Sequence, residues 1–227
     1  MQICKRAGFF NSRPGLIVKP PALLRAFYPD VLWRVDLKKD DKRVFLTFDD
    51  GPVPGVTPWV IDQLKKWDAV AAFFCVGDNV RKYPAVYEQL KNEQNTETGC
   101  HGFSHFHGHR KGRQEFLNDL EKALTLMPEV RWFRPPHGSM WPWWTSDVRH
   151  RGLNVVMWDV LSKDYDRNLT RGQVVSHVTD NIEPGSVIVF HDSLKAWPNL
   201  KVVLPVVMKW LKENGYQTGL LGSLATG

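Results

Sequence analysis

The segment RVFLTFDDGP, residues 43–52, places two adjacent acidic residues directly after a short apolar run. The run 43–48 is rich in residues that favour strands and is followed by a Gly-Pro turn, which predicts a buried β-strand. Side chains of consecutive residues in an extended chain point in opposite directions, so Asp49 and Asp50 can serve two parts of one site. Taken alone, Asp-Asp-Gly-Pro is more typical of a structural turn. Whether it is part of a functional site depends on the polar residues elsewhere in the chain.

Outward from this strand, short apolar runs alternate with segments of helical periodicity. This order predicts an α/β fold, in which helices cover a parallel sheet from outside. About seven such units make a closed or nearly closed β/α barrel the first choice and an open doubly wound sheet the second. Further strands are predicted over 69–75, 96–100, 130–134, 154–159 and 186–190. Helices are predicted over 58–67, from Pro84, over 113–127, over 174–182 and over 199–213. Thr57 is expected to cap the helix over 58–67, and Thr170 with Gln173 to form a capping box before the helix over 174–182.

The length of 227 residues suits one domain with a sizeable core, and no repeat or linker divides the chain. Residues 1–40 contain Pro14, Pro20 and Pro29 and are predicted to be an irregular lead-in packed on a domain of residues 41–227. The first fifteen residues lack a convincing apolar stretch and a cleavage site, so no signal peptide is predicted. This slightly favours the cytoplasm, with association with the cell envelope as the alternative.

The net charge of +6 comes from basic residues that are interleaved with acidic ones, as in RVDLKKDDKR, residues 34–43. No nucleic-acid-binding motif accompanies the charge, so no nucleic-acid partner is expected. No apolar run is long enough to span a bilayer, which predicts no transmembrane segment. The oligomeric state is not indicated by the sequence.

Three cysteines, Cys4, Cys75 and Cys100, argue against a disulfide framework. Cys75 lies in AVAAFFCV and is expected to be a small buried hydrophobe. Cys100 directly precedes His101, and a core-facing strand residue is favoured about four to one over a metal ligand there.

Polar side chains stand at the carboxyl ends of five predicted strands, the edge where β/α barrels carry their chemistry. One such residue is readily explained as a helix cap, but five strands together favour an active site. The residues at these ends are Asp49 and Asp50, His101, Arg134, Asp164 and His191. The stretch GCHGFSHFHGHR, residues 99–110, also holds His101 and His105, whose spacing suits a zinc pair that still needs a third ligand.

Five motifs in order make the chain resemble the polysaccharide deacetylases, carbohydrate esterase family 4 with its NodB-like domain, over about residues 41–220. The motifs are TFDDGP (47–52), ETGCHGFSH (97–105), RPPHG (134–138), WDVLSKDY (158–165) and VIVFHD (187–192). Four positions depart from the family pattern. His137 replaces the usual tyrosine, Leu161 a frequent aspartate, Tyr165 a frequent tryptophan, and Gly102 a usual threonine or serine, which bears on substrate choice more than on the metal.

The resemblance implies a distorted β/α barrel whose residues 41–227 are catalytic, and it assigns roles residue by residue. Asp50, His101 and His105 would be the metal ligands; Asp49 would be the general base and His191 the general acid. Arg134 would hold Asp49, while Asp164 would orient Arg134 or His191. The backbone N–H at His137 would help to stabilise the oxyanion. The expected substrate contacts are Pro136, His137, Trp141 and Tyr165.

Two histidines and one carboxylate leave a coordination position open for water, as catalytic zinc sites do. Zinc is therefore the expected divalent cofactor, with cobalt or nickel as alternatives. His107 and His109 are expected in an exposed loop rather than at the metal, with a substrate contact as the less favoured alternative. His150 and His177 are expected to be ordinary helical residues. Trp141, Trp143 and Trp144 are each expected either to pack in the core or to line a carbohydrate groove.

The first hypothesis for function is a hydrolase that removes N-acetyl groups from a poly- or oligosaccharide containing N-acetylhexosamine, such as a peptidoglycan- or chitin-like substrate. One alternative is the same chemistry on a small acylated sugar or another amide. Another is a carbohydrate-binding protein that keeps the fold without catalysis. A nucleic-acid binder, suggested by charge alone, comes last.

Overall fold

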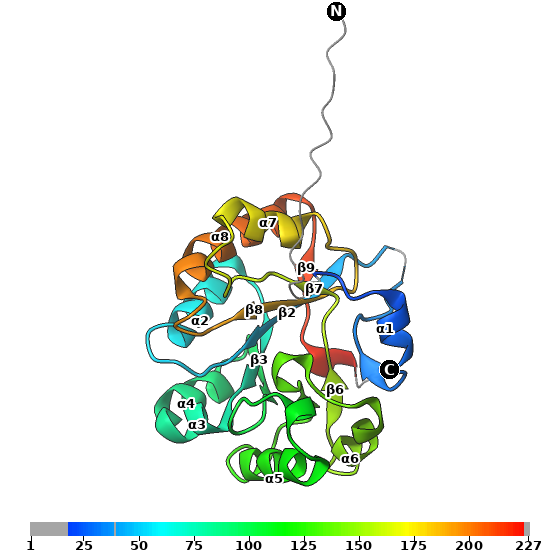
Figure 1. Cartoon of the computed structure of the whole chain (residues 1–227). Helices are drawn as coiled ribbons and strands as arrows, with labels where there is room; N and C mark the ends of the chain where they lie inside the picture. The colour runs from blue at the N-terminus through cyan, green and yellow to red at the C-terminus, as the bar shows by residue number, and fades with distance from the viewer. Residues whose placement is uncertain (1–17, 39, 225–227) are drawn as a thin grey trace, which may run out of the picture.

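A curled parallel sheet forms the centre of the molecule in the computed structural model, which describes residues 18–38 and 40–224 (Figure 1). The main sheet has the spatial order β1 (Val31–Leu32), β6 (Asn154–Val156), β5 (Trp132–Phe133), β4 (Thr96–Cys100), β3 (Ala71–Cys75), β2 (Arg43–Asp49), β8 (Val187–His191) and β7 (Val160–Leu161), and β9 (Gln217–Thr218) pairs separately with β2. The prediction of a distorted β/α barrel is confirmed. Within the described residues no ladder joins β1 to β7, so the barrel is open there.

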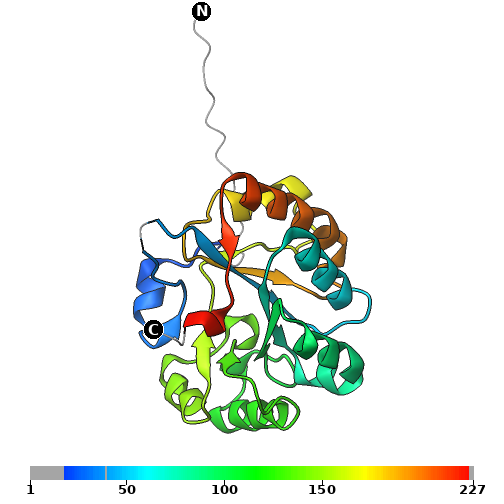
Figure 2. The same cartoon turned by 180° about the vertical axis from the view of Figure 1, so that it is seen from behind.

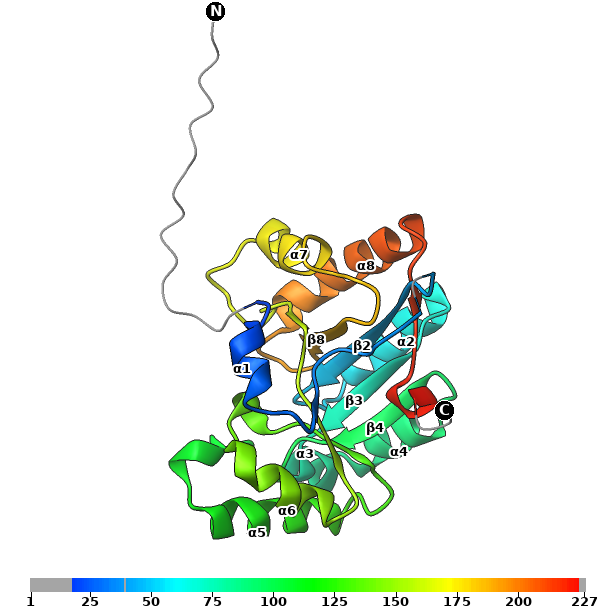
Figure 3. The ribbon, with the colours of Figure 1, turned by 90° about the vertical axis from the view of Figure 1, so that its right-hand side faces the viewer.

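Helices cover the outer face of the curled sheet (Figures 2 and 3). They are α2 (Thr57–Trp67), α3 (Gly77–Lys82), α4 (Pro84–Asn92), α5 (Arg113–Leu124), α6 (Thr145–Arg149), α7 (Arg171–Thr179) and α8 (Trp197–Glu213). The short helix α1 (Ala22–Ala26) has no buried residue, and the 3₁₀ turns are η1 (Gly108–Arg110), η2 (Pro136–Gly138), η3 (Pro142–Trp144) and η4 (Leu221–Leu224). In α8 the buried residues recur at helical spacing, from Leu200 through Leu204 to Leu211, and form one apolar face. Each helix in the described ranges is too short or too polar to cross a lipid bilayer.

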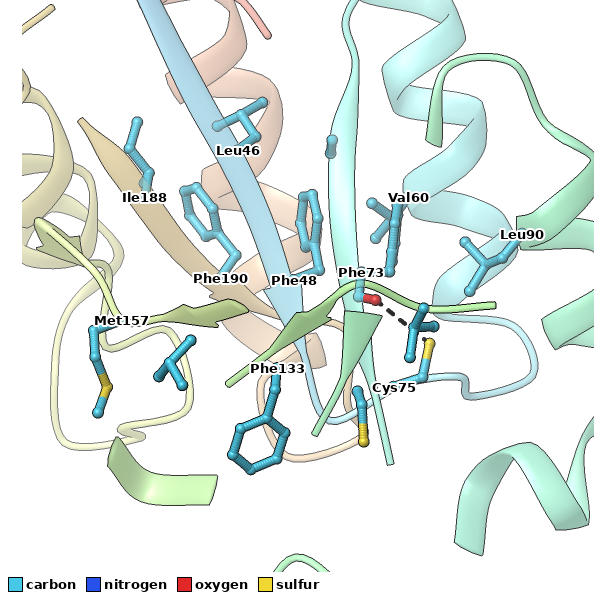
Figure 4. Packing of buried hydrophobic residues seen from close by; sticks show 14 of the residues in the cluster. Leu46, Phe48, Val60, Phe73, Cys75, Leu90, Phe133, Met157, Ile188 and Phe190 are labelled. Carbon is cyan, nitrogen blue, oxygen red and sulfur yellow. Dashed lines mark hydrogen bonds between the residues drawn. The ribbon is translucent and has the colours of Figure 1, made fainter. Parts of the chain in front are cut away.

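The central strands are buried on both faces, which explains their almost continuous apolar sequences. Phe48 of β2 stacks on Phe73 of β3 and on Phe190 of β8, with ring centroids 5.1 and 5.9 Å apart, in the layer between sheet and helices (Figure 4). Phe45 and Phe74 belong to a second cluster on the opposite, inner face. Since side chains alternate along a strand, this register also turns Asp49 toward the interior of the barrel.

The cysteine predictions are confirmed. Cys75 and Cys100 are both fully buried free thiols, and both belong to the layer between sheet and helices. Cys4 lies outside the described residues. Burial raises the pKa of the Cys100 thiol to about 12, which keeps it protonated and makes it a poor metal ligand.

The lead-in departs from the prediction in the part that the structure describes. Helix α1 and strand β1 fall within the region expected to be irregular, and β1 pairs in parallel with β6, with Val31 opposite Val155. A strand of two residues carries too little periodicity to be found in a sequence. Residues 1–17 and 39 lie outside the described part of the chain, and the division at residue 40 stays a prediction.

The two predicted helix caps have different outcomes. The capping box of Thr170 and Gln173 is confirmed at the start of α7. The prediction that Thr57 caps the following helix is wrong, because Thr57 is the first residue of α2 and makes no capping bond. Its hydroxyl accepts a hydrogen bond from the Val53 N–H and donates one to Asp192 instead, at 2.8 and 2.5 Å.

Candidate metal centre and active site

Asp50, His101 and His105 converge at the carboxyl edge of the sheet. One ligand atom from each lies within 4.8 Å of the other two, and His105 Nε2 is 2.9 Å from Asp50 Oδ1. Asp50 leaves β2 with a φ of 78° and His105 has a φ of 54°, so the backbone of both is in the left-handed region. Two imidazoles and one carboxylate fit a divalent cation of the zinc type and leave a coordination position open.

The ring of His101 is oriented by the main chain. Its Nδ1 lies 2.7 Å from the carbonyl oxygen of Arg134, which accepts the Nδ1–H and leaves the Nε2 lone pair for a metal. Burial lowers the pKa of His101 to about 4, so the ring is neutral near pH 7, as a ligand must be. Burial alone would raise the pKa of Asp50, but the hydrogen bond with His105 and the positive charge of His191 hold that pKa well below its usual range.

Asp49 lies behind this cluster and is held by Arg134. Arg134 Nη1 is 2.6 Å from Asp49 Oδ1 and 2.9 Å from the Thr47 hydroxyl. The remaining guanidinium nitrogens donate to the carbonyls of Val156 and Met157 at 3.3 and 2.9 Å. Every nitrogen of the guanidinium is thereby engaged, so its position is fixed, and the free Oδ2 of Asp49 stays 3.9 Å from His101 Nε2.

His191 and Asp164 form a second pair on the same edge. Nδ1 of the His191 ring is 2.7 Å from Asp164 Oδ1, and the main-chain N–H of His191 donates to Asp164 Oδ2 at 2.9 Å. Burial alone would lower the pKa of His191, but the charge and hydrogen bond of Asp164 outweigh it and raise that pKa to about 9. His191 is therefore protonated at neutral pH, and Asp164 contacts His191 rather than Arg134 among the two partners that the sequence left open.

Asp192 is a further buried carboxylate, and the sequence analysis did not single it out. It accepts the Gly51 N–H at 3.0 Å and the Thr57 hydroxyl at 2.5 Å, while its own N–H donates to the Asp49 carbonyl. Burial raises its pKa well above the ordinary range. Asp192 thus ties the end of β8 to the turn that carries both aspartates. Its place directly after His191, at a strand end, is the signal that could have revealed it.

A cleft of about 900 Å³ opens over these groups. His137 and Tyr165, two of the four expected substrate contacts, line it. Tyr165 packs edge-on against His191, with ring centroids 4.8 Å apart. Pro136 and Trp141 lie outside the lining: Pro136 is buried beside Gly102 and Trp141 is exposed on the adjacent loop. Substrate contacts at all four positions stay predictions.

The cleft also contains residues with no marked sequence signal. Asn79 of α3 donates to the Asp50 carbonyl at 2.8 Å and thereby supports the turn that follows β2. Lys195 follows β8 and lies over the Tyr165 ring, with Nζ 5.1 Å from the ring centroid. Both occur in segments where the sequence shows only ordinary polar residues, so the fold alone brings them to the site.

The remaining histidines lie apart from the convergent ligand group. His107 stacks on His137, with centroids 3.7 Å apart, and is half-buried rather than exposed. His109 is exposed, as predicted. His150 ends α6 and His177 lies in α7 with Nδ1 3.2 Å from the Ser162 carbonyl, both in ordinary helical surroundings.

A comparison with family models agrees with this geometry. The model described as "Polysaccharide deacetylase" matches residues 36–156, more than half of the chain. The chain belongs to this family. The match contains Asp49, Asp50, His101, His105 and Arg134, while Asp164 and His191 lie beyond its end.

Curated members of the polysaccharide deacetylase family are similar over most of the chain. A peptidoglycan-N-acetylglucosamine deacetylase of Bacillus cereus is 28% identical over 192 residues, covering 82% of this chain and 89% of the relative. A chitooligosaccharide deacetylase of Azorhizobium caulinodans is 29% identical over 162 residues, covering 69% of this chain and 76% of the relative.

Solved structures of family members share the fold. A peptidoglycan N-acetylglucosamine deacetylase is 25% identical with a TM-score of 0.80, covering 89% of this chain and 95% of the other. Another solved structure is a mutant of a family pseudoenzyme from Bacillus anthracis, and the mutant has restored enzymatic activity. It is 26% identical with a TM-score of 0.76, covering 86% of this chain and 71% of the other. The family thus includes both enzymes and a protein that has the fold without activity.

Proposed function

We propose that the chain is a metal-dependent hydrolase that removes N-acetyl groups from a glycan containing N-acetylhexosamine. The observation that carries the proposal is the convergence, on one edge of the barrel, of an open metal-ligand triad, a buried aspartate and a protonated histidine. The deacetylase activities named for the curated relatives support the substrate class, and a peptidoglycan- or chitin-like chain is the candidate.

On the attacking side, Asp49 is the base of the proposed reaction. Asp50, His101 and His105 would hold a divalent cation, zinc by its ligand set, which would polarise the acyl carbonyl and lower the pKa of a water molecule. Asp49 accepts a proton from the water as the water oxygen bonds to the acyl carbon. Arg134 fixes Asp49 in position, because its guanidinium pairs with Oδ1 and leaves Oδ2 toward the triad.

On the leaving side, His191 supplies the proton that an amine needs in order to depart. The imidazolium donates its Nε2 proton to the sugar nitrogen as the C–N bond breaks, giving acetate and a free amine. Asp164 holds Nδ1 and thereby aims Nε2 into the cleft. The pKa of about 9 for His191 means that the donor form is present at neutral pH.

Metal content and acetate release, measured on the same preparations, test the proposal. We expect about one equivalent of a divalent metal per chain and acetate release from N-acetylglucosamine oligomers or peptidoglycan. The double variant His101→Ala, His105→Ala should lose both. His150→Ala is the matched control, because His150 is exposed at the end of α6 and should keep both.

Two other outcomes separate the alternatives. Acetate release from monosaccharides but not from oligomers would assign the chain to small acylated sugars. Bound metal without acetate release from any acylated sugar would place it with the family's pseudoenzyme. Absence of metal after reconstitution would overturn the mechanism.

A further inference from the structure

Two loops beside the cleft run alongside each other and carry aromatic rings outward from the metal-ligand group. His137 contacts His105 and His107, with ring centroids 4.5 and 3.7 Å away. Farther from the metal-ligand group, the Ser139 hydroxyl accepts a hydrogen bond from the main-chain N–H of His109 at 3.0 Å. The same hydroxyl lies 3.1 Å from Nδ1 of the His109 ring. A side chain at Gly108 would have its Cβ 2.1 Å from the Ser139 carbonyl oxygen, so glycine is what allows the two loops to lie this close.

The outer end of this seam is a pair of exposed tryptophans. Trp141 packs edge-on against His109, with centroids 4.7 Å apart, and stacks on Trp143 at 4.8 Å with an interplanar angle of 15°. Their exposed fractions are 41% and 64%, so neither is needed to fill the core. Trp144 differs, since it is buried and packs against Phe116.

The loop that carries the pair is anchored on both sides. Met140 is fully buried and its carbonyl accepts the Tyr28 hydroxyl at 2.7 Å, while Trp144 fixes the other end in the core. Trp141 and Trp143 are thus held on a rigid support, and binding a ligand there would cost little ordering entropy. Trp141 is four positions after His137 in the chain, so their Cα atoms are at most about 14 Å apart.

We infer that the row formed by His107, His137, His109, Trp141 and Trp143 is an outer subsite for the glycan chain, which begins at the cleft and extends beyond the sugar that carries the reacting acetamide. This inference rests on the proposed function. Flat aromatic faces next to imidazole donors and acceptors suit pyranose rings, which present apolar C–H faces and polar hydroxyl edges. Continuity with the cleft, through the contact between His107 and the cleft residue His137, favours a glycan over another occupant of the tryptophan pair.

The inference predicts that binding depends on chain length, because only an oligomer that extends beyond the sugar in the cleft would contact Trp141 and Trp143, which lie outside the cleft lining. It is tested by binding N-acetylglucosamine oligomers of one to six units to the full chain in an Asp49→Asn background, measured by titration calorimetry. We expect the hexamer to bind at least tenfold more tightly than the dimer. Adding Trp141→Ala and Trp143→Ala should bring the two affinities within about twofold, with dimer binding unchanged.

Two controls accompany the double variant. Trp143→Phe keeps an aromatic face and should retain most of the preference for the hexamer. Val206→Ala removes an exposed apolar side chain on α8 and should leave the preference unchanged. An unchanged melting temperature in the tryptophan variant shows that it remains folded, as expected for two exposed side chains.

The subsite and the catalytic proposal fail in different ways. If the hexamer binds more tightly only when the tryptophans are present, and the native chain releases no acetate, the subsite is supported and the catalytic proposal is overturned. A hexamer that binds no more tightly than the dimer, or as tightly without the tryptophans, overturns the subsite. Loss of self-association in the tryptophan variant, with glycan binding unchanged, also overturns it and assigns the pair to a contact between protein copies.

Discussion

Arg134 and Asp49 form an ion pair in the barrel interior, with Nη1 2.6 Å from Oδ1 and side chains that are 1% and 7% exposed. Burial lowers the pKa of Arg134, yet the carboxylate and the ring of Phe74, 4.1 Å from the guanidinium carbon, favour its charged form. The pair therefore couples the stability of the barrel to the position of the proposed base.

Replacing Arg134 with methionine should destabilise the fold by about 3–5 kcal/mol, because it leaves Asp49 buried without a counter-charge. Urea denaturation of the metal-free protein measures the change. Arg81→Ala is the matched control, since Arg81 and Asp78 form a pair whose side chains are 59% and 29% exposed, and its loss should cost about 0–1 kcal/mol. Equal costs for the two variants would contradict a special role for the buried pair.

Asp49→Asn should keep the metal and lose turnover. Asparagine preserves the shape of the side chain but cannot take a proton, so acetate release should fall about 10²–10⁴-fold. Metal content and acetate release are measured on the same sample. Asp78→Asn changes another acidic residue of the cleft and should have a far smaller effect. Full activity of Asp49→Asn would remove Asp49 from the mechanism.

The His191–Asp164 pair predicts how stability depends on pH. The folded-state pKa of about 9 lies above the ordinary value of 6.5, so the pair contributes its full stabilisation below pH 6.5 and loses it as the pH rises through 9. In the metal-free protein this contribution is up to about 3 kcal/mol. Asp164→Asn should flatten the decline between pH 6 and 10 in urea denaturation, and parallel profiles for the two proteins would refute the assignment.

Gly51→Ala should destabilise the turn that carries both aspartates. The added Cβ would lie 2.1 Å from Asp192 Oδ2, so Asp192 or the turn must move. Such overpacking costs about 1–3 kcal/mol, and we expect weaker metal binding as well, since Asp50 directly precedes Gly51. Gly172→Ala is the control: its Cβ meets nothing within 4 Å in helix α7, so it should stabilise by about 0.5–1 kcal/mol. Normal metal affinity in Gly51→Ala would show that Asp192 does not position the turn.

Much of the site follows from period-two alternation and from the strand ends. Side chains at the carboxyl ends of β2, β4, β5 and β8 face one interior, so Asp49, His101, Arg134 and His191 could be placed together from their spacing to the strands. The position of Asp192 at a strand end gave a signal too, but its bond to Thr57, like the role of Asn79, depends on the packing of α2 and α3 beside the turn. Strand β1 could not be predicted for another reason: its two residues form a strand only because they pair with β6, where Val31 lies opposite Val155.

The sequence left open whether the tryptophans pack in the core or line a groove. The structure buries Trp144 and leaves Trp141 and Trp143 exposed.

The pairing of β1 with β6 also has a consequence for synthesis on the ribosome. Val31 cannot form its strand pair until Val155 has been translated, on the order of ten seconds later at ordinary elongation rates. Asp50, His101 and His105 emerge within that interval, whereas Asp164, His191 and Asp192 emerge after it. The nascent chain therefore carries the three candidate metal ligands well before it carries the groups that complete the other side of the cleft, and the apolar residues of β1 have no strand partner until β6 has been made.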